Sequence, residues 1–456
     1  MNESVITSSD YAMQLRDALT VTRVTGASFA YWDGTTLHAA TAGVRNSVTG
    51  DAVTADTIMH IGSISKVLNT VLMMQLVDDG LISLTDPIMR HLPELRLKDE
   101  SALPKITCAM LVNHTSGIDG MILPDYGPDR ERIEDAIDRC SGLDQLHPPG
   151  GGPSYCNVGM VIAGYLTQKL RGESWYTLVK RRIYEPLGMN HAIADLTDLP
   201  RFRHSIGDLT DPAIGSVTQT ARAFLPLSFA PCGTTLMMTA TDLVIFARSL
   251  IIGGSKQNRI LSNDACAQMA APTVAIENPA NCHWGLGWMI LPGGLLHHTG
   301  GGPGVASSLY VHAASGRVAA LLTNCDQGHA LRRLIVEPIV ASWTGHADPT
   351  PKQYAGTHNA EAYVGVYENH MLRIEILLID AELKFQLKAK ARIYDNSPLV
   401  GQSSAPDHSL RPVGDDVFDG TMLPGIPRTS VRFSKPDIGG RMQELQFMLH
   451  LFRRTA

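Results

Sequence analysis

Three short groups of residues carry side chains that could perform acyl transfer. The first is Ser63-Ile64-Ser65-Lys66. A serine hydroxyl becomes a strong nucleophile only when a base removes its proton, and a lysine three residues later on a helix lies on the same face. A desolvated lysine amine can act as that base. Taken alone, the pattern also fits a capping serine followed by a surface lysine.

The second group is Tyr155-Cys156-Asn157, which directly follows the turn-forming stretch HPPGGGP at residues 147–153. A tyrosine beside an ammonium can relay a proton, and an asparagine amide can bind a substrate carbonyl. By itself such a triplet is usually structural. In an extended segment Cys156 points away from its two neighbours, so we expect its side chain to be packing.

The third group, His298-Thr299-Gly300, lies in the glycine-rich segment LLHHTGGGPG. Glycines let a substrate backbone approach a strand edge, and the Gly301 N–H could pair with that of Ser63 as an oxyanion hole. The alternative is a glycine-rich hairpin turn with two incidental histidines. We do not expect His297 and His298 to share a metal ion, because neighbouring strand residues point to opposite faces.

The order and spacing of these groups resemble the serine β-lactamase, penicillin-binding protein and family VIII esterase superfamily, in its class C branch. That family has Ser-x-x-Lys, then Tyr-x-Asn, then Lys-Thr-Gly or His-x-Gly. The flanking segments are similar too, and the resemblance covers roughly residues 12–345. They read MHIGSISKVLNTVLMMQLVDDGLISLTDPI, ITCAMLVNHTSGI, YEPLGMNHA, WGLGW and GGGPGVASSLYV.

The resemblance implies a β-lactamase/transpeptidase-like fold of the α/β (α+β) class. A central antiparallel sheet would be flanked by helices, with a helical region beside it and the site between them. It also implies that Ser63 is acylated and that Lys66 and Tyr155 share base and acid duties. Asn157 and His298 would contact the substrate.

One departure from the family pattern reduces the number of activities that we expect. His298 stands where β-lactamases and transpeptidases have a lysine that helps hold a substrate carboxylate, and a histidine is mostly neutral at pH 7. The histidine form is usual among esterases, D-aminopeptidases and other peptidases of the family. We therefore expect a serine hydrolase, and first a peptidase or amidase acting on small peptides, including ones with D- or unusual residues. A carboxylesterase, an acyltransferase, and a non-catalytic ligand sensor or scaffold remain alternatives.

Local patterns predict the elements that position these residues. Residues 63–79 have apolar positions at helical spacing, and Gly80 suits the end of that helix. Helices are also expected at residues 11–20, in the run VGMVIAGYLTQKL after Asn157, and in TDLVIFARSLI. Strands separated by turns are expected at residues 21–45 and 284–325, which indicates an antiparallel sheet.

The composition changes near the segment TGHADPTPKQYAGTHNA, which is rich in turn formers. We expect a catalytic domain at 1–345, a linker at 346–360 and a small all-β domain at 361–456, built from short alternating segments such as YVGVYEN and LRIEILLI. This last part resembles the lipocalin-like barrels appended to some D-aminopeptidases and related peptidases.

The composition of the 456 residues excludes other classes of protein. The net charge of −6 without a long Lys/Arg run argues against nucleic-acid binding. Seven cysteines without a CxxC argue against a disulfide framework or a zinc site. The first residues do not read as a secretory signal, and no apolar stretch reaches the ~20 residues of a membrane span. We expect a cytoplasmic protein with a small-molecule or short-peptide substrate, no nucleic-acid or membrane partner, no cofactor and no metal.

Overall fold

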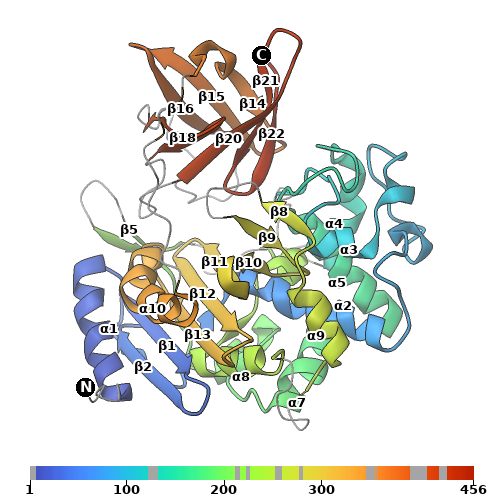
Figure 1. Ribbon diagram of the computed structural model, residues 1–456. Helices are drawn as coiled ribbons and strands as arrows, with labels where there is room; N and C mark the ends of the chain where they lie inside the picture. The colour runs from blue at the N-terminus through green and yellow to red at the C-terminus, as the bar shows by residue number, and fades with distance from the viewer. Residues whose placement is uncertain are drawn as a thin grey trace.

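The computed structural model describes residues 7–121, 132–210, 216–221, 226–251, 259–276, 281–345, 354, 356, 358–390, 408–420 and 429–456. Figure 1 shows a larger part made of helices and strands and, above it, a smaller part made of strands alone. Most of the predicted linker, residues 346–360, lies outside the described residues.

The larger part is built on an antiparallel sheet with eight strands in the described residues, in the order β2-β1-β13-β12-β11-β10-β9-β8. Strand β1 is almost wholly buried, which is expected of a strand covered on both faces. This sheet confirms the predicted strands at residues 21–45 and 284–325. Its strands are β1 (Gly26–Trp32), β2 (Leu37–Gly43), β8 (Val274–Ile276), β9 (Cys282–Trp284), β10 (Met289–Leu291), β11 (Leu295–Gly302), β12 (Val305–His312) and β13 (Arg317–Thr323).

Helices cover both faces of this sheet. Helices α1 and α10 share one apolar cluster with the sheet, while α2, α5 and α8 contribute to a second, larger cluster on its other side. The helices are α1 (Ser8–Thr22), α2 (Ser65–Asp78), α3 (Cys108–Val112), α4 (Ile133–Asp138), α5 (Asn157–Arg171), α6 (Trp175–Val179), α7 (Glu185–Leu187), α8 (Ala240–Arg248), α9 (Asn263–Ala270) and α10 (Gly328–Thr344). Smaller strand pieces are β3 (Met59–His60), β4 (Ala192–Ile193), β5 (Asp208–Thr210), β6 (Val217–Gln219) and β7 (Met237–Met238).

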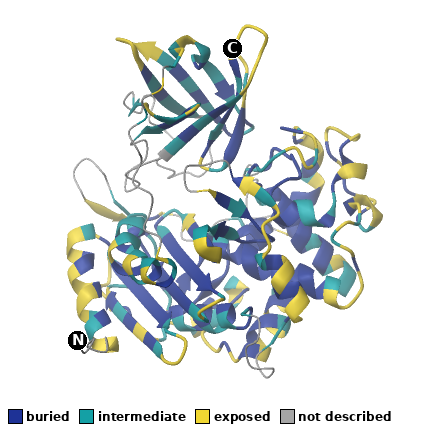
Figure 2. Cartoon of the chain, in the orientation of Figure 1, coloured by how far each residue is buried: buried dark blue, intermediate teal, exposed yellow. Residues whose placement is uncertain are grey.

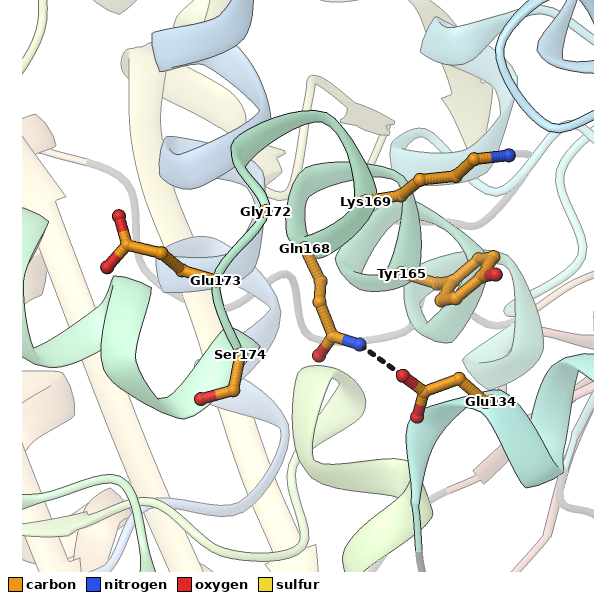
Figure 3. A pocket seen from close by; sticks show the side chains of 7 residues that line it. All are labelled: Glu134, Tyr165, Gln168, Lys169, Gly172, Glu173 and Ser174. Carbon is orange, nitrogen blue, oxygen red and sulfur yellow. Dashed lines mark hydrogen bonds between the residues drawn. The ribbon is translucent and has the colours of Figure 1, made fainter.

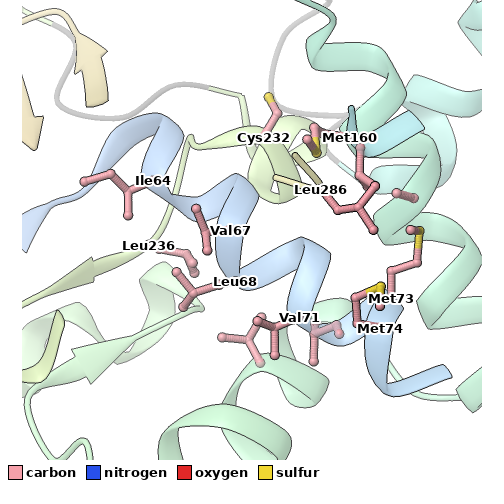
Figure 4. Close-up of a cluster of buried hydrophobic side chains, with 14 of the residues drawn as sticks. Ile64, Val67, Leu68, Val71, Met73, Met74, Met160, Cys232, Leu236 and Leu286 are labelled. Carbon is pink, nitrogen blue, oxygen red and sulfur yellow. The ribbon is translucent and has the colours of Figure 1, made fainter. Parts of the chain in front are cut away.

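Helix α2 runs through the centre of the larger cluster (Figure 4). The helix was predicted from one apolar face, yet every residue from Ser65 to Leu76 is buried, so it has no solvent face until its last turn. Its polar side chains find partners inside. The Asn69 amide donates to the Met160 carbonyl at 2.9 Å and accepts from the Trp175 indole at 2.8 Å. Buried polar groups need such partners, which explains how an amphipathic pattern can form a central helix.

The C-terminal part is one antiparallel sheet with nine strands among the described residues, in the order β17-β16-β15-β14-β22-β21-β20-β19-β18. Its two end strands are separated by one residue in the chain, so the sheet curls until its ends meet in a nearly closed barrel. Large apolar side chains fill the interior. The strands are β14 (Gly365–Glu368), β15 (Leu372–Ile379), β16 (Glu382–Ala389), β17 (His408–Ser409), β18 (Arg411–Gly414), β19 (Val417–Gly420), β20 (Thr429–Pro436), β21 (Met442–Phe447) and β22 (His450–Arg454).

Burial follows this architecture (Figure 2). The central strands β1, β12 and β13 and helix α2 are almost wholly buried, whereas the outer helix α1 shows alternating buried and exposed positions. In the described part of the chain, no helix has both the length and the apolar character needed to cross a membrane.

Candidate active site

Ser63 and Lys66 meet at the start of α2. A 3₁₀ turn, Gly62–Ile64, precedes the helix, so the helix begins two residues later than predicted. Ser63 lies in the turn and Lys66 in the first turn of the helix, and residues three apart along such a continuous helical path share one face. The Lys66 Nζ lies 3.0 Å from the Ser63 Oγ and donates to the Cys232 carbonyl at 2.6 Å. Lys66 is fully buried, whereas Ser63 is partly exposed and open to a ligand.

Glycines let three backbone segments meet around Ser63. Gly62 has a φ of 53°, and a Cβ placed on it would lie 2.8 Å from the Gly301 nitrogen. A Cβ on Gly233 would lie 2.8 Å from the Ser63 nitrogen. By contrast, a Cβ on Gly301 would meet nothing within 4 Å. The backbone nitrogens of Ser63 and Gly301 therefore lie near one another, beside an open side where a substrate carbonyl can enter.

Tyr155 lies beside Lys66. The lysine Nζ is 4.7 Å from the centroid of the tyrosine ring, within the range of a cation–π contact. The ring centroid of Tyr155 is 5.9 Å from that of Trp284 and 6.4 Å from that of His298. Trp288, in contrast, belongs to the main apolar core. Of these two tryptophans, Trp284 therefore lies beside the site and Trp288 lies in the core.

His298 projects to the active-site side of β11, and its neighbour His297 projects to the other side. His297 stacks on Tyr310 at a centroid distance of 4.0 Å, so the expected separation of the two histidines is confirmed. Burial lowers the pKa of His298 to about 3, and the charge of Lys66 acts in the same direction. His298 is therefore a neutral imidazole, and its Nε2 has no hydrogen-bond partner within the described residues.

Asn157 is placed differently from the other candidates. It begins α5, and its side-chain amide donates to the Met121 carbonyl. Its expected contact with substrate stays a prediction. Cys156 packs as predicted and has a second task, because its Sγ accepts the Gly159 N–H at 3.2 Å and caps α5.

Sequence reasoning did not single out His114 as a site residue, although the segment that contains it was part of the family resemblance. It is fully buried with a φ of 63°, and its Nδ1 accepts the Cys156 N–H at 3.1 Å. Its ring centroid lies 4.5 Å from Tyr155 and 4.6 Å from Trp284. Burial holds its pKa well below the usual range. The motif HTSG was visible in the sequence, but the left-handed conformation that turns the ring toward Tyr155 was not.

The C-terminal sheet also contributes to the site. The Leu449 carbonyl accepts the Tyr155 N–H at 2.8 Å, and the His450 ring contacts the Tyr155 ring at a centroid distance of 5.5 Å. A third contact ties the two parts together, because Asp119 accepts the His370 N–H at 2.6 Å. No local pattern in the sequence signals these contacts, since they join the C-terminal part to loops that are distant from it in the chain.

A hollow of about 370 Å³ lies away from these residues, between α4, α5 and the start of α6 (Figure 3). Across this hollow the polar side chain of Gln168 donates a 2.5 Å hydrogen bond to the carboxylate of Glu134. None of the candidate catalytic residues lines it. Groups of three or more residues able to hold a metal are also absent from the described parts of the chain.

Comparisons with known proteins identify the family and the fold. The profile of the family described as Beta-lactamase matches residues 15–339. Penicillin-binding protein 4 of Amycolatopsis lactamdurans is 34% identical over 323 residues, which are 68% of this chain and 83% of the relative. Two solved structures share the fold. SurE has a TM-score of 0.76 at 24% identity, covering 98% of this chain and 99% of its own. D-amino acid amidase from Ochrobactrum anthropi has a TM-score of 0.61 at 22% identity, covering 73% and 98%.

Proposed function

The chain belongs to the beta-lactamase family of serine hydrolases, and we propose that it cleaves amide bonds of small peptides through an acyl-enzyme on Ser63. The observation that carries the proposal is the 3.0 Å contact between the Ser63 Oγ and the Lys66 Nζ. It pairs a partly exposed hydroxyl with a buried amine, which is the arrangement that an activated nucleophile requires.

In the proposed first step, the pair formed by Lys66 and Tyr155 takes up the Ser63 proton, while Lys66 keeps its hydrogen bond to the Cys232 carbonyl. The Ser63 Oγ then attacks the substrate carbonyl carbon, and the N–H groups of Ser63 and Gly301 bind the oxygen as it becomes negative. Tyr155, beside Lys66, passes the proton to the leaving amine as the C–N bond breaks. The substrate acyl group is then bound as an ester to Ser63.

In the second step, a water molecule gives its proton to the same pair and attacks the ester carbonyl. The C–Oγ bond breaks, Ser63 regains its proton and the acid product leaves. An amine or alcohol in place of water would make the same intermediate a donor for acyl transfer. Asn157 and His298 are proposed to contact the substrate. The proposal also includes a catalytic domain at residues 1–345 and a separate all-β domain at residues 361–456.

The neutral state of His298 supports a substrate without a carboxylate at this position. A lysine there would hold a carboxylate by its charge, whereas a buried, neutral imidazole offers only a hydrogen bond. The fold shared with a D-amino acid amidase makes amides of single amino acids and short peptides the first class to test. The seven cysteines are free and buried, which supports a reducing, cytoplasmic location.

The experiment is a comparison of p-nitroanilides and p-nitrophenyl esters of D- and L-amino acids, with Ser63→Ala as the control. We expect sustained turnover of amides by the wild type and none by the variant. Turnover of esters alone would replace the amidase with a carboxylesterase. A single stoichiometric burst on every substrate would contradict a hydrolase and favour a ligand sensor.

A further inference from the structure

The hairpin between β21 and β22 belongs to the C-terminal sheet but ends at the active site. Phe447 pairs with His450, so Met448 and Leu449 alone form its turn. In Figure 1 the lower ends of these strands point toward β8 and β9. Leu449 packs there on the apolar cluster formed by Ile276, Cys282 and Trp284, the cluster that also contacts Tyr155.

This turn adopts a conformation that its own residues do not favour. Met448 and Leu449 have φ values of 48° and 68°. A two-residue hairpin turn with both φ values positive normally contains Asn-Gly or Asp-Gly, because larger side chains are strained there. Such a departure is stable only when surrounding contacts hold it, and departures of this kind gather at functional sites. The packing of Leu449 on the catalytic part supplies those contacts.

Three hydrogen bonds connect the hairpin to the segment that carries Tyr155. The Tyr155 N–H donates to the Leu449 carbonyl at 2.8 Å, and the Leu451 N–H donates to the Ser154 Oγ at 3.2 Å. The Gln446 side chain donates to the Pro153 carbonyl at 3.3 Å. Three successive residues of the loop before α5, 153–155, are therefore held by one hairpin of the C-terminal sheet.

His450, the first residue after the turn, reaches Tyr155 itself. Its ring meets the Tyr155 ring edge-on, with an interplanar angle of 89° and a centroid distance of 5.5 Å. Burial lowers the pKa of His450 to about 4, and the charge of Lys66 acts in the same direction, while a hydrogen bond to the Tyr155 backbone opposes both. His450 is thus a neutral ring that contacts both the side chain and the backbone of Tyr155.

We propose that His450 is a positioning residue that keeps the Tyr155 ring beside Lys66, so that the C-terminal sheet completes the active site. The inference rests on the proposed function, because it assigns His450 an effect on the proton transfer by Tyr155. Under this proposal the contact between the two parts affects catalysis. A C-terminal sheet that moved away would remove the contacts of both His450 and Leu449 with Tyr155.

The test is a double-mutant cycle read out as the rate of fluorophosphonate labelling and as kcat and KM for the best substrate. His450→Ala should lower kcat by about 10- to 100-fold, the scale of a misplaced catalytic group, with little change in KM. In a Tyr155→Phe background the same substitution should change kcat by less than about threefold, because contacting residues that act together are not additive. His408→Ala, on β17 of the same sheet, is the matched control and should behave as wild type.

Two results would overturn the inference. One is an unchanged kcat in His450→Ala, and the other is an equal loss with and without the Tyr155 hydroxyl. If His450→Ala does not fold, His450→Leu fills the space without an aromatic ring or a hydrogen bond, and the same two results decide. A wild type that forms no adduct would instead refute the proposed function, so the two failures are distinguishable.

Discussion

Gly300 offers a direct test of how tightly β11 packs against the segment before Ser63. A Cβ on Gly300 would lie 2.0 Å from the Ile61 carbonyl oxygen and 2.2 Å from the Ser307 Oγ, where ordinary contact begins at 3.4 Å. In Gly300→Ala the two segments must separate by about 1.4 Å, the difference between 3.4 and 2.0 Å, which is a severe case of overpacking. The added methyl group also displaces the 2.7 Å hydrogen bond from Ser307 to Ile61.

The expected cost follows from these two effects. Overpacking costs about 1–3 kcal/mol and a lost hydrogen bond about 1 kcal/mol. At about 2–4 °C per kcal/mol, the melting temperature should fall by about 4–16 °C. Because the shift displaces the backbone next to Ser63, fluorophosphonate labelling should also slow by about 100-fold.

Gly301→Ala is the matched control, because its Cβ would meet nothing within 4 Å. Its melting temperature, measured by circular dichroism, should equal that of the wild type, so this variant is a control for stability alone. The reasoning is refuted if Gly300→Ala melts and labels like the wild type, or if Gly301→Ala loses as much stability.

Three further predictions follow from the site and from the contact between the two parts. Tyr155→Phe should reduce kcat by about 10²- to 10⁴-fold without changing the melting temperature, and full turnover would exclude its proton role. The pKa of His298 is about 3 in the folded protein and about 6.5 in the unfolded chain. Below pH 6.5 the unfolded chain therefore binds a proton that the folded protein does not, and the free energy of unfolding decreases. His298→Gln should therefore lose less stability than wild type between pH 7 and 4.5, and parallel curves would contradict this. Burial raises the pKa of Asp119 to about 6, so its contribution weakens the fold as pH rises from about 4 to about 6, by at most about 3 kcal/mol. The melting temperature of Asp119→Asn relative to wild type should rise over that range, and a constant difference would refute the assignment.

The sequence predicted best what depends on neighbours in the chain. The spacing of Ser63 and Lys66 is local, and so is the separation of His297 and His298 to opposite faces of β11. The glycines of 300–302 were expected to let a substrate backbone approach. At Gly300 the close approach is made by the chain's own segment at Ile61, and the approach of a substrate stays a prediction. The strands within residues 21–45 and 284–325 and the helices α1, α2, α5 and α8 were likewise predicted from period and turn residues, whereas α10 and β8 were not.

Contacts between distant segments could not be predicted. The Cys232 carbonyl that binds Lys66 is a backbone group, so no residue type marks it. Helix α2 was expected to have a polar face, but its polar residues are paired inside the core, and composition alone does not separate these cases. His450 was hidden because its role depends on a turn, Met448-Leu449, whose residues do not predict a positive φ. A turn whose φ values do not suit its residue types can be recognised only in the structure, where it marks a segment held by its surroundings.

The most direct test of the central claim is intact-protein mass spectrometry of the wild type and Ser63→Ala after reaction with a fluorophosphonate. The account predicts one covalent adduct on the wild type, located on Ser63 by peptide mapping, and none on the variant. An unlabelled wild type, or equal labelling of both proteins, would contradict the assignment of Ser63 as the nucleophile.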